Sequence, residues 1–393
     1  MKDSKATTGM WIRLEDPEGF PARIHREGGW VPRPLPSELA LTPLTYQILA
    51  ASEQALGRLD EAAERLPDRE YLVYYTMLRE AQSSAALENA HVSLREVLRA
   101  NLPGVKAGPD VEPILRYLEA SRAAFTNVRG GAEIDLPLLG RISSQLAPEP
   151  PAAERFWREG TSWVGGRTRG EAVLVHTPPG PHLQAAAQQW QEWVGAPCDL
   201  PLVGKLAMGH QQLELIHPFA GGNGYVARLY VSLELVRAGV LRDQILPLSL
   251  WLDRNRTEYH QRLREVVDTG DFEKFVVFFA DGIRHLCGEQ IDLIKRMEQL
   301  RARHLEKVNR SGNVRKVASG LIGMPFSNHH SIAERFGMSR KGANDVAREL
   351  ERAGLLKVEA NKRYKKIFIC EEVLDLLSTH DPVAPAEDRE VFG

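Results

Sequence analysis

One stretch of the sequence combines residue types that could do chemistry on a phosphate. It reads His217-Pro218-Phe219-Ala220-Gly221-Gly222-Asn223-Gly224-Tyr225-Val226-Ala227-Arg228. Its three glycines carry no side chains, so backbone N–H groups can approach a ligand closely. An imidazole titrates near neutral pH and can accept a proton, and an arginine can pair with phosphate oxygens. The stretch therefore predicts an anion pocket with a candidate base beside it.

Helices must position these residues, because apolar side chains recur at helical spacing on both sides of the stretch. Residues 202–216 carry Leu206 and Leu213 among polar residues, and residues 226–241 carry Leu229 and Leu233. The pattern predicts a helix, a tight glycine loop and a second helix. The N–H groups and the dipole at the start of the second helix would favour an anion.

The stretch resembles the signature of the Fic family, His-Pro-Phe-x-(Asp/Glu)-Gly-Asn-Gly-Arg-x-x-Arg. The matching residues are His217, Pro218, Phe219, Gly222, Asn223, Gly224 and Arg228. The resemblance implies a mainly α-helical core that transfers AMP from ATP to a hydroxyl side chain of a protein. It also implies that His217 is the general base and that Gly222, Asn223, Gly224 and Arg228 hold the phosphates.

Two signature positions depart from the family pattern. Gly221 stands where the family has the acidic residue that holds Mg²⁺, so Mg²⁺ is a possible cofactor whose usual carboxylate ligand is absent. Tyr225 stands where the family has its first arginine, which contacts the phosphates. Three interpretations stay open: slow adenylylation, a different donor or phosphate transfer, and a degenerate member that acts as a regulator.

A second motif lies upstream, in the segment Ser83-Ser84-Ala85-Ala86-Leu87-Glu88-Asn89. Read alone, it is a helical run that ends in a turn. It resembles the inhibitory motif (Ser/Thr)-x-x-x-Glu-(Gly/Asn) of many Fic proteins, with Ser84 and Glu88 at the defining positions. The resemblance implies that Glu88 pairs with Arg228 and blocks productive placement of the nucleotide.

Residues 156–177 contain two short β-like runs separated by a turn rich in glycine and arginine. The segment resembles the Fic flap, an Arg-x-x-x-x-Trp-x-Gly stretch followed by two prolines. The resemblance implies that a target protein docks near residues 160–177 by adding a strand to the hairpin edge. The alternative is a purely structural hairpin.

A third resemblance lies downstream, where an Arg-x-x-Tyr segment follows the signature. In the family, the residues at the positions of Asn255 and Tyr259 line the adenine side of the nucleotide pocket. Packing between helices is an equally good explanation of Tyr259.

The C-terminal part differs in kind. Ser331 and Ser339 would each cap a helix, and Gly354 would end the second one. Two strands follow, around a basic tip at residues 361–365. This order resembles a winged helix, which could bind DNA through residues 331–369, with Arg340, Lys341, Asn344 and Arg348 facing outward. A protein-interaction or dimerisation module is the alternative.

Composition sets the outer limits. The chain has 393 residues, a net charge of −2 and three widely spaced cysteines, which favour neither a disulfide framework nor a metal cluster. No apolar run suggests a signal peptide or a spanning helix, so we expect a cytoplasmic protein without membrane contact.

The expected order is an N-terminal arm with little regular structure and a helical region (1–110), a Fic core (111–290), a linker helix and winged helix (291–380), and a disordered tail (381–393). A homodimer is one option that the sequence leaves open.

Overall fold

The computed structural model describes residues 8–146, 156–165, 168–308, 312–359 and 366–378. These residues form a mainly α-helical protein with small antiparallel sheets, which confirms the expected fold class. The basic tip at 361–365 and the tail from 381 lie outside the described residues, as do the flap residues 166–167.

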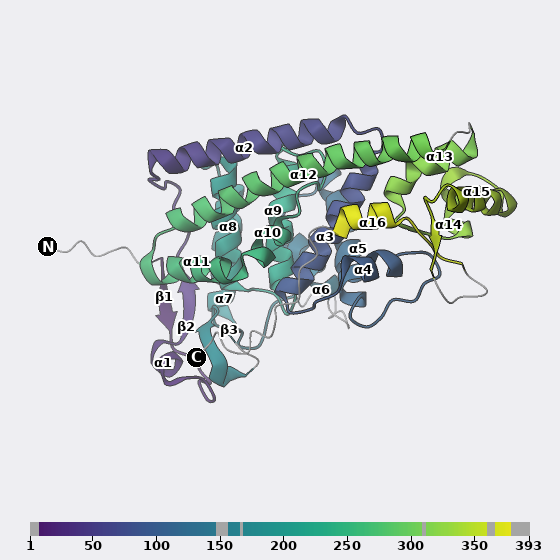
Figure 1. The fold of residues 1–393 in the computed structure, drawn as a ribbon. Coiled ribbons are helices and arrows are strands. Elements are labelled where there is room, and N and C mark those ends of the chain that lie inside the picture. The colour runs from purple at the N-terminus through teal and green to yellow at the C-terminus, as the bar shows by residue number, and fades with distance from the viewer. Residues whose placement is uncertain (1–7, 147–155, 166–167, 309–311, 360–365, 379–393) are drawn as a thin grey trace. The chain divides into compact units, whose positions relative to one another are not determined.

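The chain forms two compact units that are discontinuous in sequence. The first comprises Met1–Arg58 and Arg116–Cys287, and the second comprises Leu59–Leu115 and Gly288–Gly393. The four consecutive ranges expected from the sequence stay a prediction. Three helices continue from one unit into the other, namely α2 (Pro43–Glu64), α5 (Glu112–Arg129) and α12 (Glu273–Lys307) (Figure 1).

The first unit is built around two helices that flank the glycine loop, α8 (Leu202–Ile216) and α9 (Asn223–Arg237), which pack on each other. Helix α7 (Pro181–Gly195) packs on α8, and α6 (Leu136–Leu146) packs on α7 and α9. Trp190 of α7 and Tyr230 of α9 are fully buried, with their rings edge to face. The helices α10 (Leu248–Arg254) and α11 (Arg256–Thr269) complete this unit.

The N-terminal segment is more regular than expected, which corrects the prediction of an arm with little regular structure. It forms β1 (Gly9–Ile12), α1 (Ala22–Glu27) and β2 (Gly29–Pro32), with β1 and β2 antiparallel. Gly28 makes the turn into β2 at a φ of 93°, where a Cβ atom would lie 1.9 Å from the carbonyl oxygen of Ile12. Strand β2 packs on α8 and on β4 (Ala172–Val175), which belongs to the flap.

The second unit begins with α3 (Arg69–Leu87) and α4 (Leu94–Ala100). Later in the chain come α13 (Asn313–Gly320), β5 (Phe326–Ser327), α14 (His329–Phe336), α15 (Arg340–Arg352), β6 (Lys357–Val358), β7 (Phe368–Ile369) and α16 (Glu371–Ser378). The three strands form one antiparallel sheet in the order β5-β7-β6. Two helices that pack on each other, α14 and α15, are thus followed by two strands, in the order expected for a winged helix.

The two predicted serine caps have different outcomes. The Ser339 hydroxyl accepts a hydrogen bond from the N–H of Gly342 at 3.1 Å, so Ser339 caps α15 as predicted. Ser331 does not cap α14, because that helix begins earlier. Asn328 is the cap, and Ser331 occupies the third helical position, where it completes a reciprocal capping box.

Candidate active site

His217 ends α8 in an uncommon backbone conformation. Its φ and ψ of 53° and 58° lie in the left-handed region, and its N–H donates to the carbonyl of Leu213 at 3.0 Å. The next residues leave the helix and pair with the segment before the flap: the N–H of Arg158 donates to Pro218, and the N–H of Ala220 donates to Phe156. The candidate base therefore sits where a helix ends and a short strand pairing begins.

The buried guanidinium of Arg158 ties the base to the flap. Its Nε donates to the carbonyl of His217 at 2.9 Å, and its Nη1 and Nη2 donate to the carbonyls of Gly160 and Thr177, each at 2.7 Å. Burial lowers the pKa of Arg158 to about 10, so the group keeps its charge at neutral pH. The sequence analysis noted this arginine only as part of a flap pattern and missed its contact with the base.

The flap is the predicted hairpin. Strand β3 (Trp163–Gly165) pairs antiparallel with β4, and the register shifts between Val164 and Gly165. The chain then reaches His176, whose ring lies flat on that of His217, with centroids 4.1 Å apart and planes 4° apart. The sequence analysis did not single out His176. That the flap edge receives a target strand stays a prediction.

The glycine loop is shaped by polar contacts from within and from α6. Asn223 is buried and its amide is used internally: the N–H of Phe219 donates to its Oδ1 at 2.7 Å, and its Nδ2 donates to the carbonyl of Phe219 at 2.8 Å. Ser143 of α6 donates to the carbonyl of Gly221 at 2.7 Å. The side chain of Asn223 thus holds the loop in shape, and the phosphate role predicted for Asn223 would fall to backbone N–H groups.

Helix α9 starts immediately after Gly222, which has a φ of 65° and serves as the N-cap without a side-chain hydrogen bond. The first N–H groups of any helix have no acceptor inside the helix, so they can bind an anion. Gly222 and Gly224 lie at the start of α9, and their contacts with phosphate stay a prediction.

The two altered signature positions, 221 and 225, lie in different surroundings. A Cβ atom added at Gly221 would meet nothing within 4 Å, so the acidic position is open space. Tyr225 is half-buried, with its ring 5.2 Å from that of Tyr117 and 5.5 Å from the guanidinium carbon of Arg228.

Among the residues that the structure describes, no group of three or more histidine, cysteine, aspartate or glutamate side chains could hold a metal ion. Without a carboxylate in the loop, these residues do not fit Mg²⁺.

Arg228 faces a carboxylate inside its own unit. It is 2% exposed, and its Nη1 lies 3.7 Å from Oε1 of Glu214, one turn before His217 on α8. The ring of Tyr225 lies against the same guanidinium. The arginine predicted to meet a terminal phosphate thus lies beside a half-buried carboxylate, which the sequence analysis did not identify.

The two residues predicted to line the adenine side are engaged elsewhere. Tyr259 is 2% exposed, and its hydroxyl lies 2.9 Å from Nε2 of His210 and 3.2 Å from Glu214. Burial lowers the pKa of His210 to about 4, which keeps that ring neutral. Asn255 precedes α11, and its side chain donates to the carbonyl of Trp251 at 2.9 Å. These contacts favour the packing interpretation of Tyr259.

The predicted inhibitory residues lie at the end of α3, in the second unit. Ser84 is buried within the helix, and Glu88 is the exposed C-cap residue that follows it. Because Arg228 belongs to the first unit, the pairing of Glu88 with Arg228 stays a prediction.

The predicted outward face of α15 agrees with the burial of its residues. Arg340, Lys341 and Arg348 are exposed and Asn344 is half-buried. The buried face consists of Ala343, Val346, Ala347 and Leu350. DNA binding by this helix stays a prediction.

Within the described residues, no helix is both long and apolar enough to cross a membrane.

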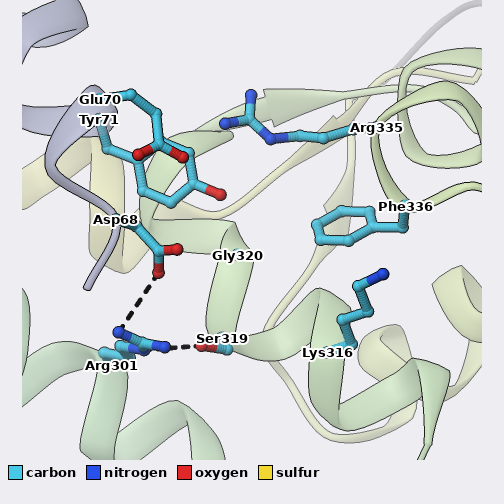
Figure 2. Close-up of a pocket in the computed structure, with 9 residues that line it drawn as sticks. All are labelled: Asp68, Glu70, Tyr71, Arg301, Lys316, Ser319, Gly320, Arg335 and Phe336. Carbon is cyan, nitrogen blue, oxygen red and sulfur yellow. Dashed lines mark hydrogen bonds and ion pairs between the residues drawn. The ribbon is translucent and has the colours of Figure 1, made fainter.

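The second unit also contains a cavity of about 490 Å³ that the sequence did not indicate. Figure 2 shows Arg335 lying over the ring of Tyr71, at 4.5 Å from its centroid, and Arg301 bonded to Asp68 and Ser319. The remaining lining residues are Glu70, Lys316, Gly320 and Phe336. Arg335 and Phe336 lie in the segment that resembles a winged helix, and the sequence analysis singled out none of these residues as a site.

Comparison with known sequences finds two regions of the chain that match the Fic/DOC family. The sequence model of the Fic/DOC family N-terminal region matches residues 46–126, and that of the Fic/DOC family matches residues 138–235. A segment of 122 residues is 35% identical to the protein adenylyltransferase Fic of Drosophila willistoni, covering 30% of this chain and 23% of that protein. The Drosophila melanogaster protein of the same name gives the same identity and coverage. The chain therefore matches about a quarter of the length of these curated relatives.

Comparison with solved structures extends the likeness over more of the chain. A Fic family protein from Desulfovibrio desulfuricans G20 superposes with a TM-score of 0.55 at 17% identity, covering 84% of this chain and 97% of that one. An identity this low shows the fold alone. The glycine loop between α8 and α9, the two matching family regions and this shared fold together show that the chain belongs to the Fic family.

Proposed function

We propose that this protein is a Fic-type nucleotidyl transferase, which moves AMP or another phosphate-containing group from a nucleotide to a hydroxyl side chain of a protein. The observation that carries the proposal is the placement of His217. Its left-handed backbone ends α8, its carbonyl is held by Arg158, and the glycine loop that follows leads into the N-terminus of α9.

In this reaction the imidazole of His217 accepts the proton of the attacking hydroxyl. The hydroxyl oxygen forms a bond to the α-phosphorus while the bond from that phosphorus to the leaving oxygen breaks. With ATP, pyrophosphate departs with the electron pair. The N–H groups at the start of α9 stabilise the charge that develops on the phosphate.

The nucleotide is ATP or another donor, and the loop handles its charge with fewer groups than the family signature provides. Gly221 offers no metal ligand, and Tyr225 offers at most a neutral hydrogen bond. A charge-assisted hydrogen bond contributes roughly 1.5–3 kcal/mol, so the loss of one arginine weakens polyphosphate binding by about one to two decades. We therefore expect slow transfer from ATP.

Glu88 is proposed to inhibit the enzyme by pairing with Arg228. The supporting observation is that the motif lies as expected, with Ser84 inside α3 and Glu88 exposed at the end of the same helix. A carboxylate and a guanidinium form strong paired hydrogen bonds when they meet. Removal of Glu88 would then release Arg228 for the nucleotide.

The test compares wild type, Glu88→Gly and His217→Ala, each incubated with labelled ATP and with other labelled nucleotides. We expect Glu88→Gly to label protein faster than wild type, and we expect His217→Ala to lose at least about 100-fold in rate, as is usual for a general base. Mass spectrometry of the treated lysate identifies the added group. The enzyme proposal fails if Glu88→Gly shows no labelling that depends on His217 with any nucleotide.

A second candidate function is that of a DNA-binding regulator whose Fic core senses a nucleotide or partner. The observation that favours it is the exposed basic face of α15 in a helix-turn-helix order. Phosphate contacts weaken steeply as salt rises. We expect the full chain to bind duplex DNA at low salt and to bind it less well once Arg340, Lys341 and Arg348 are replaced by alanine. An absence of binding at low salt overturns this candidate.

A further inference from the structure

His176 lies against the candidate base without belonging to the signature. It follows β4 on the flap, and its imidazole lies on that of His217 with centroids 4.1 Å apart and planes 4° apart. The exposed fraction of His176 is only 5%, so the contact is enclosed by protein. Two rings from distant parts of the sequence are thus held face to face.

The orientation of the His176 ring is fixed from the opposite strand of the flap. Its Nδ1 lies 3.1 Å from the hydroxyl oxygen of Ser162, and its backbone N–H donates to the carbonyl of Ser162 at 3.0 Å. Ser162 immediately precedes β3, so both strands of the hairpin contribute to the position of this ring. A ring held in this way can restrict the rotation of the ring stacked on it.

The charged and titratable groups that act on His176 come from two other segments. They are His217 at the end of α8 and the Arg158 guanidinium, which holds the carbonyl of His217. Burial, then His217, then Arg158 lower the pKa of His176 well below its ordinary value. On α8 the nearest carboxylate in sequence, Glu214, is paired with Arg228 of α9. These effects favour the neutral form of the His176 ring.

We propose that His176 is a positioning residue for His217: its ring, fixed by Ser162, lies flat on the imidazole of the base and holds it in one rotation for proton transfer. Reactions that depend on a positioned base lose rate when the base is slightly misplaced. A charged ring would be repelled by Arg158 and by the protonated base, whereas a neutral ring is not.

The inference rests on the proposed function for its consequence in catalysis, but the stack itself can be measured without any activity. The test uses the full chain in five forms: wild type, His176→Phe, His176→Leu, Ser162→Ala and His217→Ala. Phenylalanine keeps a flat ring, leucine keeps only bulk, and alanine at position 162 removes the contact that fixes the ring. The variant His217→Ala assigns the signals of His217 in the spectrum of histidine ring protons. Thermal unfolding of each variant shows that it folds.

Two readouts decide the proposal. In the spectrum, we expect the ring protons of His217 to move downfield in His176→Leu and to stay upfield in His176→Phe, because only an aromatic ring shields the protons that lie over its face. In transfer assays, we expect roughly a tenfold fall in kcat for His176→Leu, with KM for the nucleotide nearly unchanged, and near-normal kcat for His176→Phe. Ser162→Ala should lower kcat by a smaller factor.

The opposite results overturn it. If the His217 signals stay in place in His176→Leu, the rings do not stack in solution. If the leucine and phenylalanine variants transfer equally well, or if the leucine variant changes KM alone, His176 does not position the base. If the released protein, Glu88→Gly, shows no transfer that depends on His217 with any nucleotide, the proposed function fails, while the ring-proton spectrum still confirms or refutes the stack.

Discussion

The two sides of His217 differ in how much of their polar machinery is present. On the flap side, Arg158 donates to three carbonyls at 2.9 Å or less, and the stacked His176 is fixed by Ser162. On the loop side, residues 221–228, the acidic position is a glycine and the first arginine position is a tyrosine. Different segments therefore position the base and supply the charge for phosphate, so the two properties can be altered separately.

The largest effect is expected from a substitution on the flap side. Arg158→Met keeps much of the bulk but removes every hydrogen bond of the guanidinium. Hydrogen bonds to charged groups contribute about 1.5–3 kcal/mol each, and the buried carbonyls would lose their donor, so we expect a loss of roughly 3–5 kcal/mol in the free energy of unfolding. Urea unfolding measures this loss.

Arg158→Lys is the matched control for that prediction. A lysine keeps the charge but cannot reach several carbonyls in a fixed fork, so it should restore only part of the stability. If Arg158→Met unfolds at the same urea concentration as wild type, the flap side is not held together in the way its geometry indicates.

Acid should weaken both sides, because the flap side contains one buried neutral histidine and another contacts the loop side. The pKa of His176 lies well below its ordinary value of 6.5, and that of His210, whose Nδ1 lies 3.0 Å from the carbonyl oxygen of Ala227, is about 4. As the pH falls below 6.5, the unfolded chain binds these protons first, so stability falls until the folded pKa is reached. Each histidine contributes a slope of up to about 1.4 kcal/mol per pH unit.

Urea unfolding at several pH values between 7.5 and 4.5 measures that slope. His176→Phe should remove the contribution of the flap side, and His210→Gln should remove that of the loop side. A slope that neither substitution reduces would assign the acid sensitivity to other groups.

A smaller effect is expected from restoring the two charged residues of the family signature on the loop side. A side chain at position 221 would enter open space, so Gly221→Asp together with Tyr225→Arg should be tolerated. We expect ATP to bind roughly 10- to 100-fold more tightly in the double variant because of the added arginine, with a further gain from the added carboxylate when Mg²⁺ is present. Calorimetric titration with and without Mg²⁺ checks both parts. The single variant Tyr225→Phe serves as a control that adds no charge, and equal affinity in all three proteins would contradict the prediction.

The parts of the fold with strong local signals could be predicted from the sequence. The helices around the glycine loop follow from apolar periodicity, and the structure has α8 at Leu202–Ile216, as expected. Ser339 was correctly identified as a cap because it directly precedes a periodic run. Ser331 was wrongly predicted as a cap, because Asn328, three residues earlier, is an equally good cap residue. Only the packing of α14 determines which of the two residues caps the helix.

The contacts that act across the sequence could not be predicted in this way. Arg158 and His217 lie far apart in the chain, and nothing in their local patterns shows that one holds the carbonyl of the other. The same holds for the stack of His176 on His217 and for Glu214 beside Arg228. Tyr259 matched a family position, yet its burial against His210 depends on how α11 packs on α8.

The N-terminal hairpin has a practical consequence for anyone who prepares a shortened protein. The matching family regions begin at residue 46, so cloning to that limit would discard β1, α1 and β2. The discarded part includes Trp30, whose carbonyl accepts the hydroxyl of Thr177, the residue directly after His176. A recombinant fragment that begins at residue 46 would lack the N-terminal strands that contact the flap. Low activity in such a fragment would result from this truncation and not from the chemistry of the glycine loop.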